Sequence, residues 1–215
     1  MIHYATFAHK LTGFWLTPPV FAHGGAGIKI YIPYTPPVIG DIRMTTRRHE
    51  NDFYPTPPPA TRALTEVEAF CGDIWEPACG NGAISDVLSE KNAVISTDLH
   101  DYGFGGGFGL DFLAAEHLLA PNIVTNPPYK HAQAFIQKAI GLGAKKHCWL
   151  LRLSFLESKK RKAEIFDISP PSRVWVFSKR LTIWRGDEVP TSTGTTAYAW
   201  FVWDHGTTDT KLGWI

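Results

Sequence analysis

The segment Asn126–Pro127–Pro128–Tyr129 has the residue types needed to hold a planar amino group. Two consecutive prolines stiffen the loop and remove two backbone N–H donors, so the Asn126 side chain and the Pro127 carbonyl can both accept hydrogen bonds from one NH2 group. Such acceptors draw the nitrogen lone pair out of conjugation and make the nitrogen nucleophilic. Tyr129 would stack on the planar group that bears this nitrogen, as aromatic side chains do on nucleobases.

Two further motifs have the composition of ligand-binding turns. In the run Glu76–Pro77–Ala78–Cys79–Gly80–Asn81–Gly82, Gly80 and Gly82 allow a tight strand-to-helix turn that a ligand can approach closely. Asp98 lies 16 positions after Gly82 at the end of the next expected strand, where a carboxylate accepts hydrogen bonds from ribose hydroxyls. Each motif taken alone is also compatible with a purely structural turn.

Strand patterns alternate with helical patterns from residue 73 onward. We expect strands over 73–76, 94–97, 122–125, 147–153, 173–177 and 197–203, and helices over 82–90, 131–140 and 161–166. This alternation predicts an α/β fold with a doubly wound, mostly parallel sheet. Ligands bind at the carboxyl ends of the strands in such sheets, so the three motifs should meet there.

The net charge of +1 hides an uneven distribution along the 215 residues. Residues 50–144 carry four Lys/Arg against twelve Asp/Glu, whereas residues 145–185, here called the basic segment, carry eleven against three. A basic segment of this kind indicates a polyanionic partner, although a solvated surface is the simpler alternative. The candidate nucleic-acid contacts in it are Lys159, Lys160, Arg161, Lys179, Arg180, Trp184 and Arg185.

Composition and cysteine content exclude several classes of protein. The chain is 44% hydrophobic, which argues against intrinsic disorder, and it has no run of 18 apolar residues that could span a membrane. Three cysteines without CxxC spacing predict free thiols in a cytoplasmic protein and no zinc site. We expect residues 1–43, which are rich in Pro and Gly, to be an extension, or alternatively an ordered arm, ahead of one domain over 44–215.

The motifs Glu76–Gly82, Asp98, Asp111–Phe112–Leu113 and Asn126–Tyr129 together resemble those of S-adenosylmethionine-dependent amino-methyltransferases. The run from Asn51 to Trp203 is similar to small adenine-N6 DNA methyltransferases of phages and prophages, some of which protect DNA from restriction. The resemblance implies a Rossmann-like class I fold whose seven-stranded sheet ends in an antiparallel strand. It also implies S-adenosylmethionine as the cofactor, no metal, double-stranded DNA as the partner, a flipped target base and a monomer as the favoured state.

The resemblance also assigns roles by position. The cofactor-binding residues would be Tyr54 and Thr56 near the methionine moiety, Glu76, Ala78 and Gly80 on the floor, Gly82 in the same motif, Asp98 at the ribose, Asp111 at the adenine amino group and Phe112 on its ring. The catalytic residues Asn126, Pro127, Pro128 and Tyr129 would hold and stack the target base. Only 15 positions separate Asp111 from Asn126, which leaves no room there for a target-recognition domain and predicts weak sequence discrimination.

Three alternatives stay open at the level of sequence. An Asn-Pro-Pro-Tyr loop suits the N4 group of cytosine as well as the N6 group of adenine, in DNA or in RNA. It also suits a protein glutamine amide, the substrate of release-factor modifying enzymes. The third alternative is an inactive, methyltransferase-like subunit that only binds nucleic acid.

Overall fold

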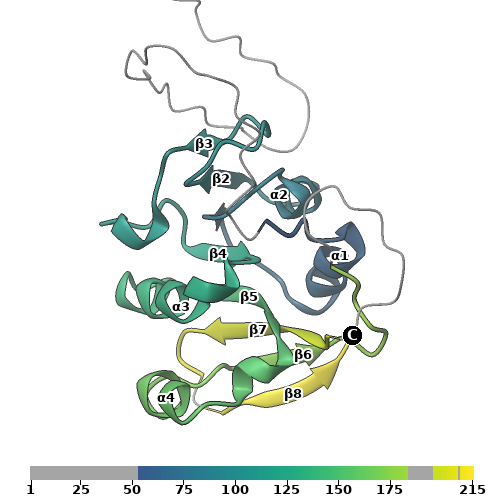
Figure 1. Ribbon diagram of the computed structural model, residues 1–215, viewed down its shortest axis with the longest axis vertical. Helices are drawn as coiled ribbons and strands as arrows, with labels where there is room; N and C mark the ends of the chain where they lie inside the picture. The colour runs from purple at the N-terminus through teal and green to yellow at the C-terminus, as the bar shows by residue number, and fades with distance from the viewer. Residues whose placement is uncertain (1–52, 184–195, 208) are drawn as a thin grey trace, which may run out of the picture.

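The computed structural model describes residues 53–183, 196–207 and 209–215. The expected extension over residues 1–43 and the candidate contacts Trp184 and Arg185 lie outside these ranges. Within them, eight strands form one sheet in the order β3-β2-β1-β4-β5-β7-β6-β8 (Figure 1). The strands are β1 (Ile74–Glu76), β2 (Val94–Asp98), β3 (Gly107–Phe108), β4 (Asn122–Thr125), β5 (Lys146–Arg152), β6 (Arg173–Val176), β7 (Tyr198–Asp204) and β8 (Lys211–Trp214).

The strand directions confirm a doubly wound, mostly parallel sheet. All neighbouring pairs from β3 to β5 are parallel, and β7 lies antiparallel between β5 and β6. β7 is the strand expected over 197–203. The sheet has one strand more than the seven expected, because β8 adds to the edge of β6. β8 is parallel to β6, so the antiparallel strand is the last but one in the chain rather than the last.

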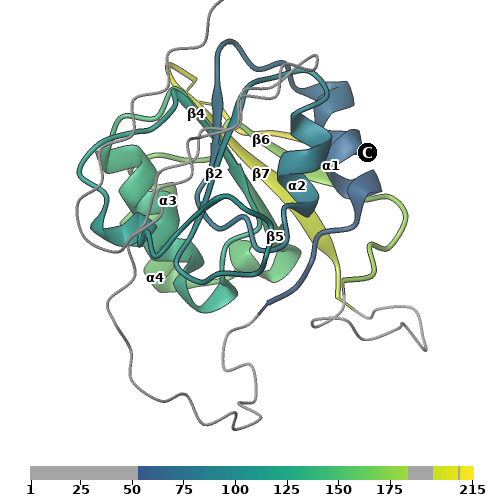
Figure 2. The same cartoon turned by 90° about the horizontal axis from the view of Figure 1, so that it is seen from above.

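Four α-helices accompany the sheet in the described residues, and three short 3-10 helices and a π-helical turn connect them to strands. The α-helices are α1 (Pro58–Val67), α2 (Ala83–Leu88), α3 (Ala132–Gly141) and α4 (Lys159–Arg161), and the connecting turns are η1 (Phe112–Ala114), η2 (Tyr129–His131), η3 (Leu153–Leu156) and the π-helical η4 (Lys162–Phe166). α1 and α2 cover one face of the sheet, and α3 and α4 cover the other (Figure 2). No helix in the described ranges is long and apolar enough to cross a membrane.

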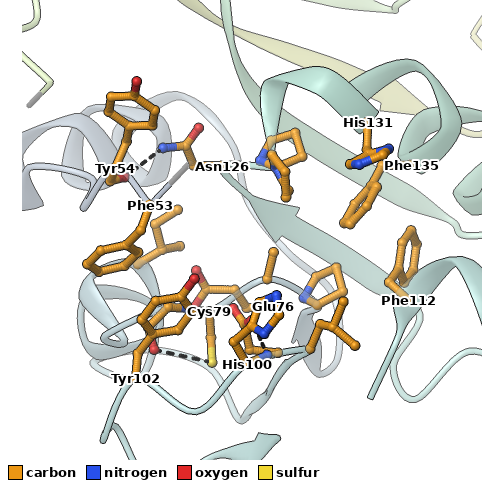
Figure 3. Close-up of a pocket in the computed structure, with 18 of the residues that line it drawn as sticks. Phe53, Tyr54, Glu76, Cys79, His100, Tyr102, Phe112, Asn126, His131 and Phe135 are labelled. Atoms are coloured by element: carbon orange, nitrogen blue, oxygen red, sulfur yellow. Dashed lines mark hydrogen bonds between the residues drawn. The ribbon is translucent and has the colours of Figure 1, made fainter. Parts of the chain in front are cut away.

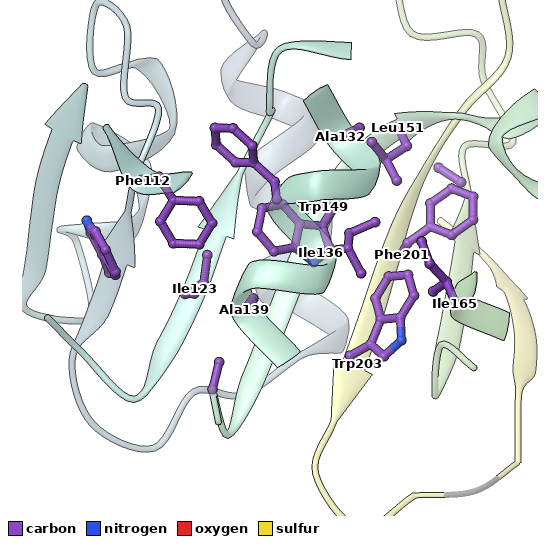
Figure 4. Packing of buried hydrophobic residues seen from close by; sticks show 14 of the residues in the cluster. Phe112, Ile123, Ala132, Ile136, Ala139, Trp149, Leu151, Ile165, Phe201 and Trp203 are labelled. Atoms are coloured by element: carbon purple, nitrogen blue, oxygen red, sulfur yellow. The ribbon is translucent and has the colours of Figure 1, made fainter. Parts of the chain in front are cut away.

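The buried core is split between the two faces because successive strand residues point to opposite sides. In β5, Trp149 and Leu151 pack with Ile136 of α3 (Figure 4). Cys148 and Leu150 pack on the face covered by α1 and α2. β7 alternates in the same way, and all but the last of its residues are buried. The central pair β5–β7 therefore anchors both layers, and the carboxyl ends of the parallel strands are left free to form a site.

Three elements were not predicted from the sequence: α1, β3 and β8. The run Pro57–Pro58–Pro59 reads as a helix breaker, yet it occupies the cap and first turn of α1, where a missing N–H removes no intrahelical hydrogen bond. β3 lies within the Gly-rich run Gly103–Gly109, and Gly106 lets it approach β2, because a Cβ there would lie 2.7 Å from the Ser96 carbonyl oxygen.

Candidate active site

A pocket of about 410 Å³ opens at the carboxyl ends of β1, β2 and β4 (Figure 3). It collects residues from the three motifs and from the segment before α1, as the parallel sheet predicts. The predicted site residues in its lining are Tyr54, Thr56, Glu76, Ala78, Gly80, Asp98, Asp111, Phe112, Asn126, Pro127, Pro128 and Tyr129. Gly82 is absent from the lining, and so are the described residues of the basic segment.

The Asn126 side chain is held in one orientation by the segment before α1. Its Nδ2 donates to the carbonyl oxygen of Tyr54 and to Oγ1 of Thr56, at 3.1 Å each. A carbonyl oxygen can only accept, so the amide nitrogen must face Tyr54 and the amide oxygen must face away. That oxygen, Oδ1, is buried and has no hydrogen-bond partner among the described residues. A buried acceptor without a partner is energetically costly and marks the position where a donor is missing.

Tyr129 is the first residue of the 3-10 turn η2 and lies beside Asn126 in the pocket wall. Its ring lies 5.7 Å from that of Tyr54 and 6.1 Å from that of Tyr198, both tilted. The guanidinium of Arg152, the last residue of β5, lies over the same ring at 5.0 Å from its centroid. Burial raises the pKa of Tyr129, so the phenol is neutral. The Tyr129 ring is thus held by neighbouring side chains, and it lies next to Asn126 Oδ1, which has no hydrogen-bond partner among the described residues.

The glycine motif forms the turn from β1 to α2. Gly80 and Gly82 have φ angles of +52° and +81°, which favour glycine. Both are also closely covered by aromatic rings: a Cβ on Gly80 would lie 2.5 Å from Phe53, and a Cβ on Gly82 would lie 2.1 Å from Phe104. The Phe104 ring explains why Gly82 does not line the pocket, although the sequence places it with the cofactor residues.

Two buried carboxyl groups lie under this turn. Burial raises the pKa of Glu76 well above its usual value, and Glu76 accepts a hydrogen bond from Ser85, whose hydroxyl lies 2.5 Å from that of Ser96. Burial also raises the pKa of Asp98, whose two oxygens each accept a backbone N–H at 2.9 Å, from Gly80 and His100. A carboxylate has about four acceptor positions, so Asp98 keeps acceptor capacity toward the pocket.

Asp111 and Phe112 begin the turn η1 on the far side of the pocket. Asp111 caps this turn by accepting a hydrogen bond from the N–H of Leu113 at 2.9 Å. Phe112 is 2% exposed and packs against Trp75 and Phe135 at centroid distances of 5.0 and 4.9 Å. Phe112 therefore belongs to the core and offers the pocket only part of its surface.

Sequence reasoning missed several residues of the pocket wall. Phe53 and Tyr102 stack at 4.4 Å with 18° between their rings and join the segment before α1 to the Gly-rich run (Figure 3). His100, His131 and Phe135 also line the pocket. The signal in the sequence was that Tyr102 directly precedes the Gly-rich run and Phe104 and Phe108 lie inside it, because disordered segments contain few aromatic residues. No group of three His, Cys, Asp or Glu side chains in the described ranges could hold a metal ion.

The basic segment does not act as one surface. Arg173 and Lys146 are the first residues of β6 and β5, and both pair with buried Glu68. They lie where the parallel strands begin, here called the amino edge of the sheet; the carboxyl edge is where these strands end. Arg161 directs its guanidinium to the carbonyl oxygens of Phe155 and Glu157. Lys160 lies 3.9 Å from Glu164. Lys159, Lys179 and Arg180 are exposed, and the last two follow β6 at the carboxyl edge.

No model of a protein family and no curated protein sequence matches this chain. Solved structures do match it. One is the methyltransferase subunit of a type I restriction-modification system from Streptococcus thermophilus, with 8% identity and a TM-score of 0.54 over 74% of this chain and 47% of that one. Another is a candidate RNA methyltransferase from Pyrococcus horikoshii, with 12% identity and a TM-score of 0.53 over 70% and 85%.

The fold is that of Rossmann-like methyltransferases. The chain spans about half the length of the restriction-modification subunit, 47%, and most of the Pyrococcus protein, 85%. At these identities the likeness concerns the arrangement of helices and strands. A function for this chain must therefore be inferred from the residues of the pocket.

Proposed function

We propose that this protein transfers a methyl group from S-adenosylmethionine to an exocyclic amino group of a base in DNA, and that the target is N6 of adenine. The observation that carries the proposal is the free Oδ1 of Asn126, which is buried, fixed in orientation and next to the Tyr129 ring. An NH2 group presented to this oxygen satisfies it, and the planar group that bears the NH2 stacks on Tyr129.

The rest of the pocket fits the cofactor. S-adenosylmethionine, when bound, supplies a methyl group on a positively charged sulfur. Glu76, Asp98 and Asp111 all line the pocket and match a ligand that carries a positive charge, ribose hydroxyls and an amino group. Gly80 lines the pocket at the end of β1 beside the Phe53 ring, in a backbone conformation that favours glycine. A cationic ligand also favours the ionised form of Glu76, whose pKa burial raises.

Catalysis then depends on what this chain does to the amino group. Asn126 Oδ1 accepts a hydrogen bond from it and stabilises the positive charge that develops on nitrogen as the new bond forms. The two contacts from the segment before α1 hold this oxygen in place before the substrate arrives. A base in a duplex must leave the stack to reach the pocket, which costs a few kcal/mol.

A methyltransferase that acts on RNA bases is the second candidate. The observation that favours it is the fold shared with the Pyrococcus protein described as a candidate RNA methyltransferase. The pocket chemistry is the same for both substrates, because the NH2 group and the stacking surface are the same. Only an activity assay with DNA and RNA as substrates distinguishes the two candidates.

The decisive experiment measures transfer of tritiated methyl groups to duplex DNA, RNA and protein. We expect transfer to DNA, with N6-methyladenine as the product after enzymatic digestion. Asn126→Ala should lower kcat by about 10²–10³-fold and leave cofactor binding unchanged. Asn126→Asp keeps the acceptor and should retain part of the activity. Asn92→Ala, at a half-buried asparagine outside the pocket lining, is the matched control and should behave as wild type.

The same assay can contradict the proposal. Transfer to RNA or to a glutamine amide without transfer to DNA would refute the substrate. Absence of transfer to all three, together with retained nucleic-acid binding, would identify an inactive binding protein. N4-methylcytosine as the product would correct the choice of base.

A further inference from the structure

Arg152 is a cation of the basic segment that no sequence motif identified, and it lies next to the proposed base site. β5 pairs with β4 in parallel, with Thr125 opposite Trp149, so Arg152 at the end of β5 is level with the loop that follows β4. Its guanidinium lies over the Tyr129 ring at 5.0 Å from the ring centroid. The side chain is therefore placed by the sheet register and not by a mobile loop.

The electrostatic situation of Arg152 differs from that of its neighbours in the basic segment. Arg161 is occupied by backbone carbonyls and Arg173 by Glu68, whereas Arg152 forms no ion pair with any described residue. Arg152 is also exposed, although the Tyr129 ring beneath it is half-buried. A guanidinium that lies over an aromatic ring keeps its N–H donors, which lie in its own plane, directed outward, so it can bind an anion without much further ordering.

We propose that Arg152 positions nucleic-acid substrates: its guanidinium supports the Tyr129 ring and binds the phosphate of the nucleotide whose base stacks there. A planar guanidinium suits both contacts, because it stacks on aromatic faces and donates two parallel hydrogen bonds to a phosphate. The inference rests on the proposed function for the identity of the reaction, but phosphate binding by Arg152 can be measured without any methyl transfer.

Further cations lie at the carboxyl edge of the sheet, where the chain of a bound nucleic acid would continue from this nucleotide. Lys130 follows β4 and lines the pocket, and Lys179 follows β6 on the same edge, since β6 runs parallel to β5. β7 separates β5 from β6, so the cations after β4, β5 and β6 lie along one edge of the sheet with β7 between Arg152 and Lys179. A polyanionic strand that leaves the pocket along this edge meets positive charge, and Arg152 is the cation of this row whose guanidinium lies over the Tyr129 ring.

The test compares wild type with Arg152→Ala, Arg152→Lys and Lys145→Ala. Lys145 is the matched control, because it is exposed and directly precedes β5 at the opposite edge of the sheet. The measurements are Kd for a short DNA duplex at several salt concentrations, and kcat and KM for methyl transfer. Melting temperatures show whether each variant is folded, and Arg152→Lys keeps the charge in case Arg152→Ala is unstable.

We expect Arg152→Ala to raise Kd and KM about tenfold and to reduce the slope of log Kd against log salt by about one. Arg152→Lys should keep the wild-type slope with an intermediate KM, because it keeps the charge and loses the planar stacking. Lys145→Ala should match wild type. A fall in kcat with unchanged Kd and unchanged salt slope would overturn the inference, since it would leave Arg152 only a structural role at Tyr129.

The wild-type protein separates this inference from the proposed function. If wild type binds DNA and Arg152→Ala reduces the salt slope, but no methyl group is transferred, the proposed function fails and the phosphate contact stands. If wild type transfers methyl groups to DNA and Arg152→Ala leaves KM and the salt slope unchanged, the proposed function stands and the inference fails. Failure of wild type to bind any nucleic acid would overturn the inference.

Discussion

The Asn126 amide shows how the proposed catalytic residues depend on distant parts of the chain. The sequence identifies Asn126 through the two prolines that follow it, but an asparagine side chain can present either its nitrogen or its oxygen. The choice is made by Tyr54 and Thr56, about 70 positions earlier, which accept from Nδ2. The sequence places Tyr54 and Thr56 near the methionine end of a cofactor, and the structure adds this contact to Asn126.

Thr56→Val tests this contact at the residue scale. Valine has nearly the shape of threonine but cannot accept from Asn126 Nδ2, so the amide loses one of its two fixed contacts. We expect kcat to fall about tenfold, with a smaller change in KM for the nucleic acid. Thr56→Ser keeps the hydroxyl and should restore kcat. If Thr56→Val had the wild-type kcat, Tyr54 alone would be sufficient to orient the amide.

At the scale of elements, α1 is tied to the sheet by one buried carboxylate. Glu68, directly after α1, has a side chain 3% exposed and pairs with Arg173 and Lys146 at the starts of β6 and β5. Burial opposes ionisation, but hydrogen bonds from Arg173, Trp175 and Lys146 lower the pKa of Glu68. Because the residues that precede α1 hold Asn126, we expect this anchor at the amino edge to affect the candidate site at the opposite edge.

Glu68→Gln should therefore be strongly destabilising. It removes one of the two carboxylates that Arg173 and Lys146 share, since both cations also pair with Asp204. Removal of one partner of a buried ion pair costs about 3–5 kcal/mol, and the remaining contacts to Asp204 should place the loss at the lower end of that range. Urea unfolding measures the change in the free energy of unfolding. Arg62→Ala is the matched control, because the Arg62–Glu90 pair is exposed and such pairs contribute at most about 1 kcal/mol. Equal effects of both variants would contradict a structural role for the buried network.

At the scale of the whole molecule, charged residues that are grouped in the sequence are not all grouped in the structure. The acidic residues Glu76, Asp98 and Asp111 do gather at the pocket, as expected. The basic segment separates into structural cations at the amino edge, such as Arg173, and exposed cations at the carboxyl edge, such as Arg152. Sequence order alone could not separate them, because the two groups alternate along the chain, at the starts and the ends of β5 and β6.

Global stability should fall in mild acid because of His147. Burial lowers its pKa to about 3; it stacks on Trp203, and its Nδ1 accepts a hydrogen bond from Trp149. The native state keeps this ring neutral, whereas the unfolded chain protonates it near pH 6.5. Its contribution is therefore fully present above pH 6.5 and is lost progressively as the pH falls toward 3.

Urea unfolding of wild type and His147→Asn at about pH 7 and about pH 5 measures this loss. Asparagine can place an acceptor where Nδ1 lies but does not titrate. We expect the free energy of unfolding of wild type to drop by about 2 kcal/mol more than that of the variant between these pH values. Parallel losses in the two proteins would assign the acid sensitivity to other groups.

The sequence predicts the elements that have regular patterns and the motifs that follow them. The expected strand over 122–125 matches β4 in both bounds, and the expected helix over 131–140 is shifted by one residue from α3. α1 and β3 were missed because Pro and Gly have positional roles there that depend on the tertiary structure. The rings over Gly80 and Gly82 and the support of Asn126 were missed for a related reason, since both are contacts between distant segments.

β7 pairs with β5 in the middle of the sheet, although it is synthesised after β6. β7 spans residues 198–204 but lies between β5 and β6, so the middle of the sheet stays open until synthesis has passed residue 204. Before then β5 presents an unpaired edge together with Trp149 and Leu151, the kind of surface on which partly folded chains aggregate. Late closure by a non-local strand also slows folding. A newly made chain thus contains all the described residues of the pocket well before it can build the sheet that holds them.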